Sequence, residues 1–291
     1  MKDTFVEIDG IRHWFKKSMR SNTDIPVVII HGGPGGFVKV FEQIPGKELE
    51  NHLNVIYYEQ RGCGRSNESK NDDYKIESLV HDLKCLINSW MFEKVHLLGY
   101  SFGAELAIEF ALKYPEYIEK LVLQSPSDLS DFKRTYRIQI NGIKEVLQND
   151  RKLDLDKIMK SDASIHEKYD KAWSLMDKET SDAFLFYNQK CAKWNREQWE
   201  TCGLVNTGEL ANEVIGRHRE KTVLEASKEL QHDTLIISGK YDKNVGTEIP
   251  KIYAQNIKHS KLLIFDNSAH FPDIEEPARY VKVVVDFILD K

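Results

Sequence analysis

Runs of consecutive apolar residues recur along the chain and predict the strands of a buried sheet. They occupy residues 25–30, 54–59, 94–100, 120–125, 234–239 and 261–266. A strand that helices cover on both faces is apolar at nearly every position, as these runs are. Segments with apolar residues at the helical period lie between them, at 76–90, 103–114, 248–257 and 278–289. This alternation predicts an α/β fold whose doubly wound, mostly parallel sheet has helices on both faces.

Two parts of the chain depart from this alternation. Residues 4–15, TFVEIDGIRHWF, alternate in polarity around an Asp-Gly dipeptide that favours tight hairpin turns, so we expect an antiparallel pair of strands near the start. From about residue 127 to 230 the apolar positions follow only the helical period. We therefore expect a core domain of residues 1–126 and 231–291, with a helical cap of residues 127–230 over the sheet edge where open α/β folds bind ligands. An insertion that only decorates the fold or joins subunits is the alternative.

The composition narrows the classes of partner and the compartment. The 291 residues carry 41 Lys and Arg against 46 Asp and Glu, a formal charge of −5, and the basic residues form no stripe, so nucleic acid is not an expected partner. The chain has no run of about 18 apolar residues and no apolar leader near its start, which predicts no membrane contact and a cytoplasmic protein. The four cysteines, Cys63, Cys85, Cys191 and Cys202, lack the spacing of metal ligands. We expect reduced thiols, no metal and no cofactor.

The candidate chemistry centres on Ser101, within the octapeptide GYSFGAEL. This serine directly follows the apolar run 94–100 and closely precedes the helical segment 103–114. A serine displayed at such a strand-to-helix turn has a strained backbone, and side chains two residues before and after it would collide, which explains Gly99 and Gly103. We predict that Ser101 is a nucleophile at the carboxyl edge of the sheet.

A serine nucleophile needs a general base and an acidic group that orients the base. In a fold of this kind they follow the serine in the order acid, then histidine, each on a loop after a late strand. Asp242 and His270 stand just past the last two predicted strands, in that order. Asp266 and Asp273 are alternative acids, but the first closes a strand beside the base's own loop and the second lies beyond the base.

Backbone N–H groups that stabilise the negative oxygen of an acyl-transfer intermediate form an oxyanion hole. We predict one donor at Phe102, at the start of the helix after the serine, where the helix dipole also favours negative charge. The other is predicted at Gly33, in the glycine-rich stretch HGGPGG at residues 31–36. A phosphate-binding loop is the alternative for this stretch, but the chain lacks the G-x-x-x-x-G-K-[ST] pattern and Pro34 removes a donor.

Five short motifs stand in order along the predicted core domain: HGGPGG, EQRGCGRS at 59–66, GYSFGA, SGKYD and NSAH. They resemble, in the same order, the oxyanion loop, the D-Q-R-G-x-G-x-S segment, the nucleophile turn, the acid loop and the histidine loop of the proline iminopeptidase family, within the α/β-hydrolase superfamily. The resemblance implies an α/β-hydrolase fold. It assigns the nucleophile, the acid, the base and the two oxyanion donors to Ser101, Asp242, His270, Gly33 and Phe102. Two departures are Glu59, where the family usually has Asp, and Ala104, where Gly or Ser is frequent.

The resemblance also implies cap glutamates that hold the free amino terminus of a peptide, and this chain has no obvious counterpart of them. Carboxylates in a suitable part of the cap are Glu209, Glu213, Glu220 and Glu225. Aromatic residues that could wall a substrate pocket are Trp173, Trp194, Trp199, Phe184 and Tyr187. Acidic side chains on a helical insertion are usually solvated and aromatic ones usually pack within it, so these are the alternatives. Arg61 and Arg65 are expected to bridge loops rather than to bind substrate.

The predicted function is hydrolysis by acyl transfer to water, in a proline iminopeptidase-like aminopeptidase that removes the N-terminal residue from short peptides. A carboxylesterase or lactonase with the same triad is an alternative, because a fold does not determine which bond is cleaved. A ligand-binding module on a hydrolase scaffold, with an idle triad, is an alternative of another class. A short peptide or another small molecule is the expected partner, and the sequence leaves the oligomeric state open.

Overall fold

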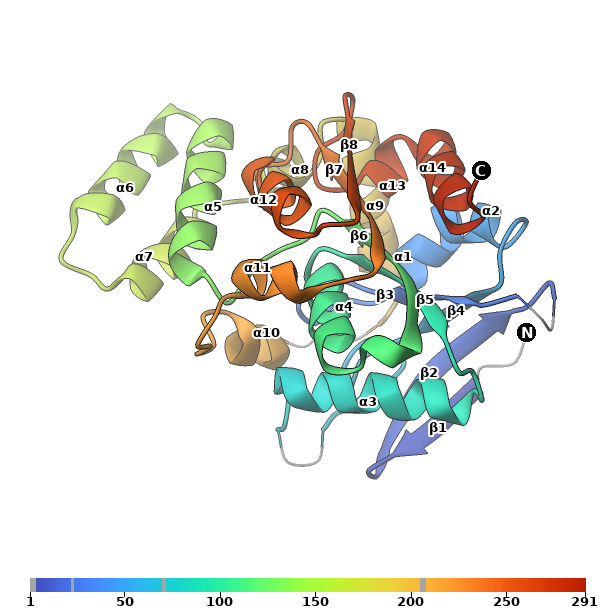
Figure 1. Ribbon diagram of the computed structural model, residues 1–291. Coiled ribbons are helices and arrows are strands. Elements are labelled where there is room, and N and C mark those ends of the chain that lie inside the picture. The colour runs from blue at the N-terminus through green and yellow to red at the C-terminus, as the bar shows by residue number, and fades with distance from the viewer. Residues whose placement is uncertain (1–3, 22–23, 70–71, 205–207) are drawn as a thin grey trace.

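An eight-stranded sheet runs through the described part of the chain, which comprises residues 4–21, 24–69, 72–204 and 208–291 of a computed structural model. Its strand order is β1-β2-β4-β3-β5-β6-β7-β8 (Figure 1). The strands are β1 (Thr4–Ile8), β2 (Ile11–Ser18), β3 (Val27–Ile30), β4 (Val55–Tyr58), β5 (Val95–Tyr100), β6 (Ile118–Gln124), β7 (Asp233–Gly239) and β8 (Ser260–Phe265). β2 is antiparallel to both β1 and β4, and every other neighbouring pair is parallel. The predicted mostly parallel sheet with an N-terminal hairpin is confirmed.

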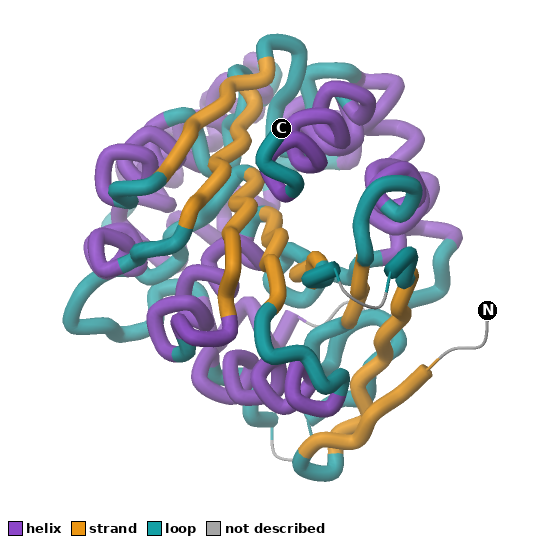
Figure 2. The backbone as a smooth tube through the Cα atoms, turned by 45° about the vertical axis from the view of Figure 1, so that its right-hand side comes forward, coloured by secondary structure: helices purple, strands orange, loops and turns teal. Residues whose placement is uncertain are grey.

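Helices cover both faces of the sheet (Figure 2). One face carries α3 (Ile76–Ser89), α4 (Phe102–Lys113) and α12 (Glu248–Asn256). The other carries α14 (Pro277–Ile288), α1 (Lys39–Phe41), a π-helical turn (Glu42–Gly46) and α2 (Lys47–Leu49). In β3, Val28 and Ile30 belong to the apolar core of the first face, whereas Val27 and Ile29 belong to that of the second. Because successive strand residues point to opposite faces, burial of both faces requires the continuous apolar runs seen in the sequence.

Helix α3 illustrates how the helical period selects a buried face. Leu79, Leu83 and Leu86 are buried against the core, while Glu77 and Asn88 are exposed. Residues three and four positions apart lie on the same side of a helix, so one apolar stripe is enough to attach α3 to the sheet.

The described residues between β6 and β7 form helices and the loops that join them, and no strand. The helices are α5 (Phe132–Val146), α6 (Asn149–Lys160), α7 (Ile165–Ser174), α8 (Lys178–Leu185), α9 (Gln189–Thr201), α10 (Gly208–Val214) and α11 (Val223–Ala226). Helices α5, α6 and α7 stand apart from the sheet at the left of Figure 1 and share a small apolar core with α8. In contrast, α10 and α11 pack into the main core through Val214 and Leu224. The division into a core and a cap of residues 127–230 stays a prediction, and residues 205–207 of that range lie outside the described residues.

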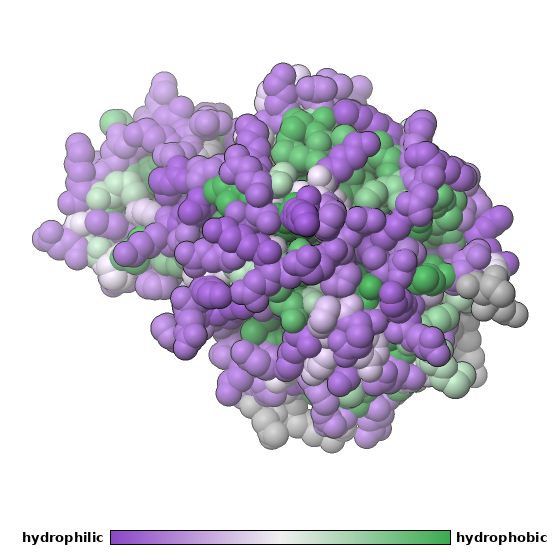
Figure 3. Space-filling model, in the orientation of Figure 1, coloured by the Kyte–Doolittle hydropathy of each residue, from purple (hydrophilic) through white to green (hydrophobic). Residues whose placement is uncertain are grey.

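Polar side chains cover most of the face seen in Figure 3, and apolar ones show mainly in its upper part, near β8 and α14. β8 is the last strand of the sheet, and its Leu262, Leu263 and Ile264 are only partly buried.

Two 3-10 turns, Pro115–Tyr117 and Ser227–Glu229, complete the secondary structure between strands. Within the described ranges, no helix combines the length and the apolar character needed to cross a membrane.

Candidate active site

Ser101 occupies the sharp turn between β5 and α4. Its φ of 55° and ψ of −123° lie where side-chain-bearing residues rarely occur, as expected for a serine displayed at such a turn. A Cβ on Gly99 would lie 2.2 Å from the backbone oxygen of Gly103, and a Cβ on Gly103 would lie 2.1 Å from that of Ile30. Both glycines are therefore required by the close approach of backbones that holds the serine in place.

Three side chains predicted to act together are hydrogen-bonded in one chain. Ser101 Oγ lies 3.0 Å from His270 Nε2, and His270 Nδ1 lies 2.9 Å from Asp242 Oδ2. All three residues are buried. The other carboxylate oxygen, Asp242 Oδ1, accepts hydrogen bonds from the backbone N–H groups of Asn244 (2.8 Å) and Val245 (3.0 Å). The carboxylate is thus fixed in the orientation that faces the imidazole.

The two rival acids do not occupy this position. Asp266 is exposed at the turn after β8. Asp273 is buried in α13 (Pro272–Glu275), where Gln124 Nε2 donates a 2.5 Å hydrogen bond to its Oδ1. Asp242 is the carboxylate that lies against His270 Nδ1.

His270 also contacts parts of the chain that the sequence did not indicate. Its backbone N–H donates to the oxygen of Leu185, the last residue of α8, at 3.0 Å, and its own backbone oxygen accepts from Ser125 Oγ at 3.0 Å. Asn244 Nδ2 lies 3.1 Å from His270 Nε2, and Asn244 Oδ1 accepts from Gln139 Nε2 at 2.7 Å. Asn244 and Gln139 are thus site residues that the sequence reading missed. The one signal was the place of Asn244, two positions after the acid.

The predicted oxyanion loop lies against the serine turn. A Cβ on Gly32 would lie 2.8 Å from the Tyr100 backbone oxygen and 3.0 Å from Ser101 Cβ. Gly33 has a φ of 130° and a cis peptide bond to Pro34, a backbone geometry that only glycine adopts easily. Gly33 and Ser101 line one cavity, and Phe102, the other predicted donor, begins α4. Their roles as oxyanion donors stay predictions.

His31, at the start of this loop, ties it to the EQRGCGRS segment. Its Nε2 accepts from the backbone N–H of Gln60 at 3.1 Å, its Nδ1 lies 2.9 Å from the Gly32 oxygen, and Gln60 Nε2 donates to the His31 backbone oxygen at 2.8 Å. Burial lowers the pKa of His31, which favours the neutral imidazole that these contacts require. His31 is therefore a structural tie between two loops.

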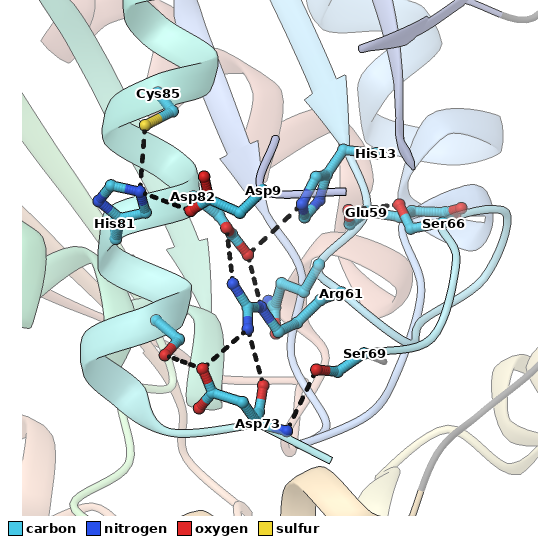
Figure 4. Close-up of polar contacts among 12 residues, drawn as sticks. Asp9, His13, Glu59, Arg61, Ser66, Ser69, Asp73, His81, Asp82 and Cys85 are labelled. Atoms are coloured by element: carbon cyan, nitrogen blue, oxygen red, sulfur yellow. Dashed lines mark hydrogen bonds and ion pairs between the residues drawn. The ribbon is translucent and has the colours of Figure 1, made fainter. Parts of the chain in front are cut away.

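The arginines of the same segment bridge loops. Arg61 Nε and Nη2 donate to the two oxygens of Asp82 at 2.7 and 2.8 Å, and Arg61 also reaches Asp73 (Figure 4). Arg65 pairs with Glu59 through Nε (3.0 Å) and Nη2 (2.8 Å). Neither arginine lines the cavity beside the serine. Both act as the sequence predicted, and Glu59, which replaces the usual Asp, is held by this pairing.

The contacts of His81, which is also drawn in Figure 4, lack the arrangement of a catalytic triad. His81 Nε2 lies 3.0 Å from Asp9 Oδ2 and 3.5 Å from Cys85 Sγ, so the acid and the thiol meet the same ring nitrogen. Burial, with the nearby Asp9 carboxylate, raises the pKa of the Cys85 thiol and disfavours the reactive thiolate. No three His, Cys, Asp or Glu side chains in the described residues are grouped to hold a metal ion.

A cavity of about 280 Å³ opens beside Ser101 and His270. The loops at the carboxyl edge of the sheet form part of its wall, and helices of the insertion form the rest through Gln139, Tyr169 and Trp173. Most of the remaining lining is aliphatic or aromatic. A largely apolar pocket with a few polar groups near a nucleophile is the usual form of a small-molecule site.

Four of the five aromatic residues expected in a pocket wall divide between the cavity and the packing of the insertion, and the fifth, Tyr187, is exposed. Trp173 and Trp199 line the cavity, and the Trp199 ring lies 4.0 Å from that of Phe37, centre to centre. Trp194 packs in an apolar cluster behind the wall, and Phe184 is buried between the helices of the insertion. The substrate-binding role of Trp194 stays a prediction, although α9 turns that side chain toward its neighbours in this cluster.

The acidic residues expected to hold an amino group lie outside the cavity. Glu209, Glu213, Glu220 and Glu225 are exposed, and none of them lines it. Glu225 forms a capping box with Thr222 at the start of α11, in which its side chain accepts from the Thr222 N–H at 2.8 Å. Helices α10 and α11 pack their apolar faces on the core, which leaves these carboxylates on the exposed side, and the substrate-binding role of Glu209, Glu213 and Glu225 stays a prediction.

Comparison with protein families identifies the class to which this fold and site belong. Residues 25–277 match the model of the alpha/beta hydrolase fold family. This range includes the serine turn, the acid loop and the histidine loop. The chain belongs to the α/β-hydrolase family.

Individual relatives show which hydrolases within the family this chain is similar to. A proline iminopeptidase of Saccharolobus solfataricus is 31% identical over 99% of this chain and 92% of its own length. A 2-hydroxy-6-oxo-2,4-heptadienoate hydrolase of Pseudomonas putida is 26% identical over 90% of this chain and 88% of its own. A solved proline iminopeptidase-related protein of Thermus thermophilus shares the fold, with a TM-score of 0.76 at 16% identity over 99% of this chain and 97% of that one. The chain is an enzyme, a hydrolase within the proline iminopeptidase-like part of the family, and the predicted resemblance is confirmed.

Proposed function

We propose that this hydrolase is a serine aminopeptidase that removes the N-terminal residue, proline in particular, from short peptides. The observation that carries the proposal is the hydrogen-bonded chain from Ser101 through His270 to Asp242, buried beside a cavity of small-molecule size. The similarity to a named proline iminopeptidase along nearly the whole chain supports the peptide substrate.

In the proposed mechanism, His270 Nε2 removes the proton of Ser101 Oγ as the oxygen attacks the scissile carbonyl. Asp242 stabilises the imidazolium that forms, and the N–H groups of Gly33 and Phe102 hold the negative oxygen. The intermediate collapses when His270 gives its proton to the leaving amine, which leaves an acyl group on Ser101. A water molecule, deprotonated by His270, then releases the acid and restores the serine.

A second candidate is hydrolysis of an ester, a lactone or another acyl compound by the same triad. Two observations support this candidate: the cavity is mostly apolar, and the chain is similar to a hydrolase with a different named substrate. A binding module with an idle triad is disfavoured, because the three side chains already have the distances that proton transfer requires.

Steady-state hydrolysis of a substrate panel tests the proposal. The panel holds arylamides of proline and of other amino acids, each with a free and with an acetylated amino group, beside short acyl esters and a lactone. We expect cleavage of the free-amine arylamides, loss of it on acetylation, and a fall of at least about 10³-fold in Ser101→Ala. Turnover of esters or lactones alone would favour the second candidate, and activity that survives in Ser101→Ala would reject both.

A further inference from the structure

Asp273 is a buried carboxyl group in the catalytic cavity that the proposed acyl transfer does not use. It lies in α13, just after His270, with 2% of its surface exposed, and it lines the cavity. Gln124 Nε2 donates to its Oδ1 at 2.5 Å, and the backbone oxygen of the same Gln124 accepts from the Ser101 N–H at 2.8 Å. One residue of β6 therefore joins this carboxyl group to the nucleophile turn.

Few hydrogen-bond donors compensate this carboxyl group. Apart from Gln124 Nε2, its own backbone N–H is the one donor to it in the described part of the chain. Gln124 Oε1 and the hydroxyl of Tyr280, which interacts electrostatically with Asp273, are buried without a hydrogen-bond partner among the described residues. Burial raises the pKa of Asp273 to about 7. The hydrogen bonds to this carboxyl group thus leave room for a positively charged donor that a ligand could bring.

His270, which interacts electrostatically with Asp273, is the one basic side chain in the described lining of the cavity. Asp128 and Asp273 are the acidic members of its described lining, which contains no Lys or Arg. Asp128 is already occupied, because it accepts from Ser130 Oγ and from the N–H groups of Asp131 (3.3 Å) and Leu224 (3.2 Å). Asp273 has spare acceptor capacity. An ammonium group would gain a charge-assisted hydrogen bond there, whereas an anionic ligand would be repelled.

We propose that Asp273 binds the free amino group of the substrate and so selects acyl residues that carry an amine beside the scissile carbonyl. This inference rests on the proposed aminopeptidase function. It gives to a residue of α13 the task that the sequence suggested for Glu209, Glu213 or Glu225, which lie outside the cavity.

Two esters of equal shape test this assignment: the p-nitrophenyl esters of proline and of cyclopentanecarboxylic acid, in which a CH2 group replaces the amine. The readout is the ratio of their kcat/KM values, corrected for their spontaneous hydrolysis, because general damage to the site lowers both. The wild type should favour the proline ester. Asp273→Asn keeps an acceptor for Gln124 but loses the charge, and should lower the ratio about 10- to 100-fold. The control Asp266→Asn, at an exposed carboxylate, should leave it unchanged.

Each outcome decides the inference. An unchanged ratio in Asp273→Asn, or a ratio lowered by Glu209→Gln or Glu213→Gln instead, overturns it and leaves the aminopeptidase function standing. A wild type that does not favour the proline ester overturns both. Asp273→Ser, which removes the charge with a smaller side chain, provides the same test if the melting curve of Asp273→Asn shows that it does not fold.

Discussion

Replacement of Asp242 by asparagine should stop catalysis while the fold persists. In the structure, Asp242 Oδ1 accepts from two fixed backbone donors, the N–H groups of Asn244 and Val245, and Oδ2 faces His270 Nδ1. The two donors require an oxygen, so the asparagine amide would turn its NH2 group toward the imidazole. Nδ1 would then have to accept a hydrogen bond, and the ring proton would move to Nε2. A protonated Nε2 cannot take the proton of Ser101.

The size of this effect follows from the chemistry of the imidazole. A base held in the wrong tautomer lowers kcat by about 10⁴-fold, or about 5 kcal/mol of transition-state stabilisation. Because asparagine has the shape of aspartate and keeps both backbone hydrogen bonds, the melting temperature should stay within a few degrees of the wild type's. Steady-state kinetics on the best substrate and a melting curve measure the two quantities, with the exposed Asp266→Asn as control. An Asp242→Asn enzyme that keeps more than about 1% of the wild-type kcat would refute the tautomer argument.

Three further variants test the framework of the site through stability. Gly103→Ala would place a Cβ 2.1 Å from the Ile30 oxygen, so urea unfolding should show a free energy of unfolding lowered by about 3 kcal/mol or more. An unchanged urea midpoint would contradict the close packing of the serine turn. Asp273 has a pKa of about 7 in the folded protein, against an ordinary value of 3.8. Between these pH values the folded protein keeps the proton of this carboxyl group while the unfolded chain loses it. The free energy of unfolding therefore falls by up to about 4 kcal/mol as pH rises from about 4 to about 7. Melting curves from acidic to alkaline pH should therefore show the melting temperature of Asp273→Asn rising relative to that of the wild type. A melting-temperature difference that does not change with pH would contradict the buried carboxyl group. Arg217→Met leaves the buried Glu105, 2.8 Å from Arg217 Nη1, without its cation and should lower the free energy of unfolding by about 3 to 5 kcal/mol. Adding Glu105→Gln in the same chain should partly restore this stability. If the double variant recovers no stability, loss of the ion pair is not the cause.

Sequence predicted best the features that short-range patterns dictate. Continuous apolar runs are needed wherever helices cover both faces of a sheet, so the core strands could be located without any knowledge of their neighbours. Ser101 between Gly99 and Gly103 is a local requirement of the same kind. Asp242 and His270 follow from topology, because the carboxyl ends of neighbouring parallel strands meet at one edge of the sheet.

The residues of the insertion were harder to place, because their roles depend on how each helix is rotated and packed. Trp173 and Trp194 look equivalent in sequence, yet one lines the cavity and the other packs behind its wall. Glu225 carried a local signal that weighed against substrate binding, since T-x-x-E at Thr222 is the pattern of a helix capping box. In the sequence, Asp273 is recognisable only as an alternative to Asp242. Its position in the cavity depends on the packing of α13, which no periodicity reports.

Hydrogen bonds join the insertion to the site in a way that argues against a merely decorative role. The oxygen of Leu185, at the end of α8, holds the backbone N–H of His270. Tyr169 of α7 donates to Gln139 of α5 at 2.6 Å, and Gln139 donates to Asn244, which lies 3.1 Å from His270 Nε2. The orientation of the predicted base is therefore set from both sides, by the sheet through Asp242 and by the insertion through these contacts. A change in the packing of the insertion would reach the imidazole directly, so its helices belong to the framework of the predicted active site.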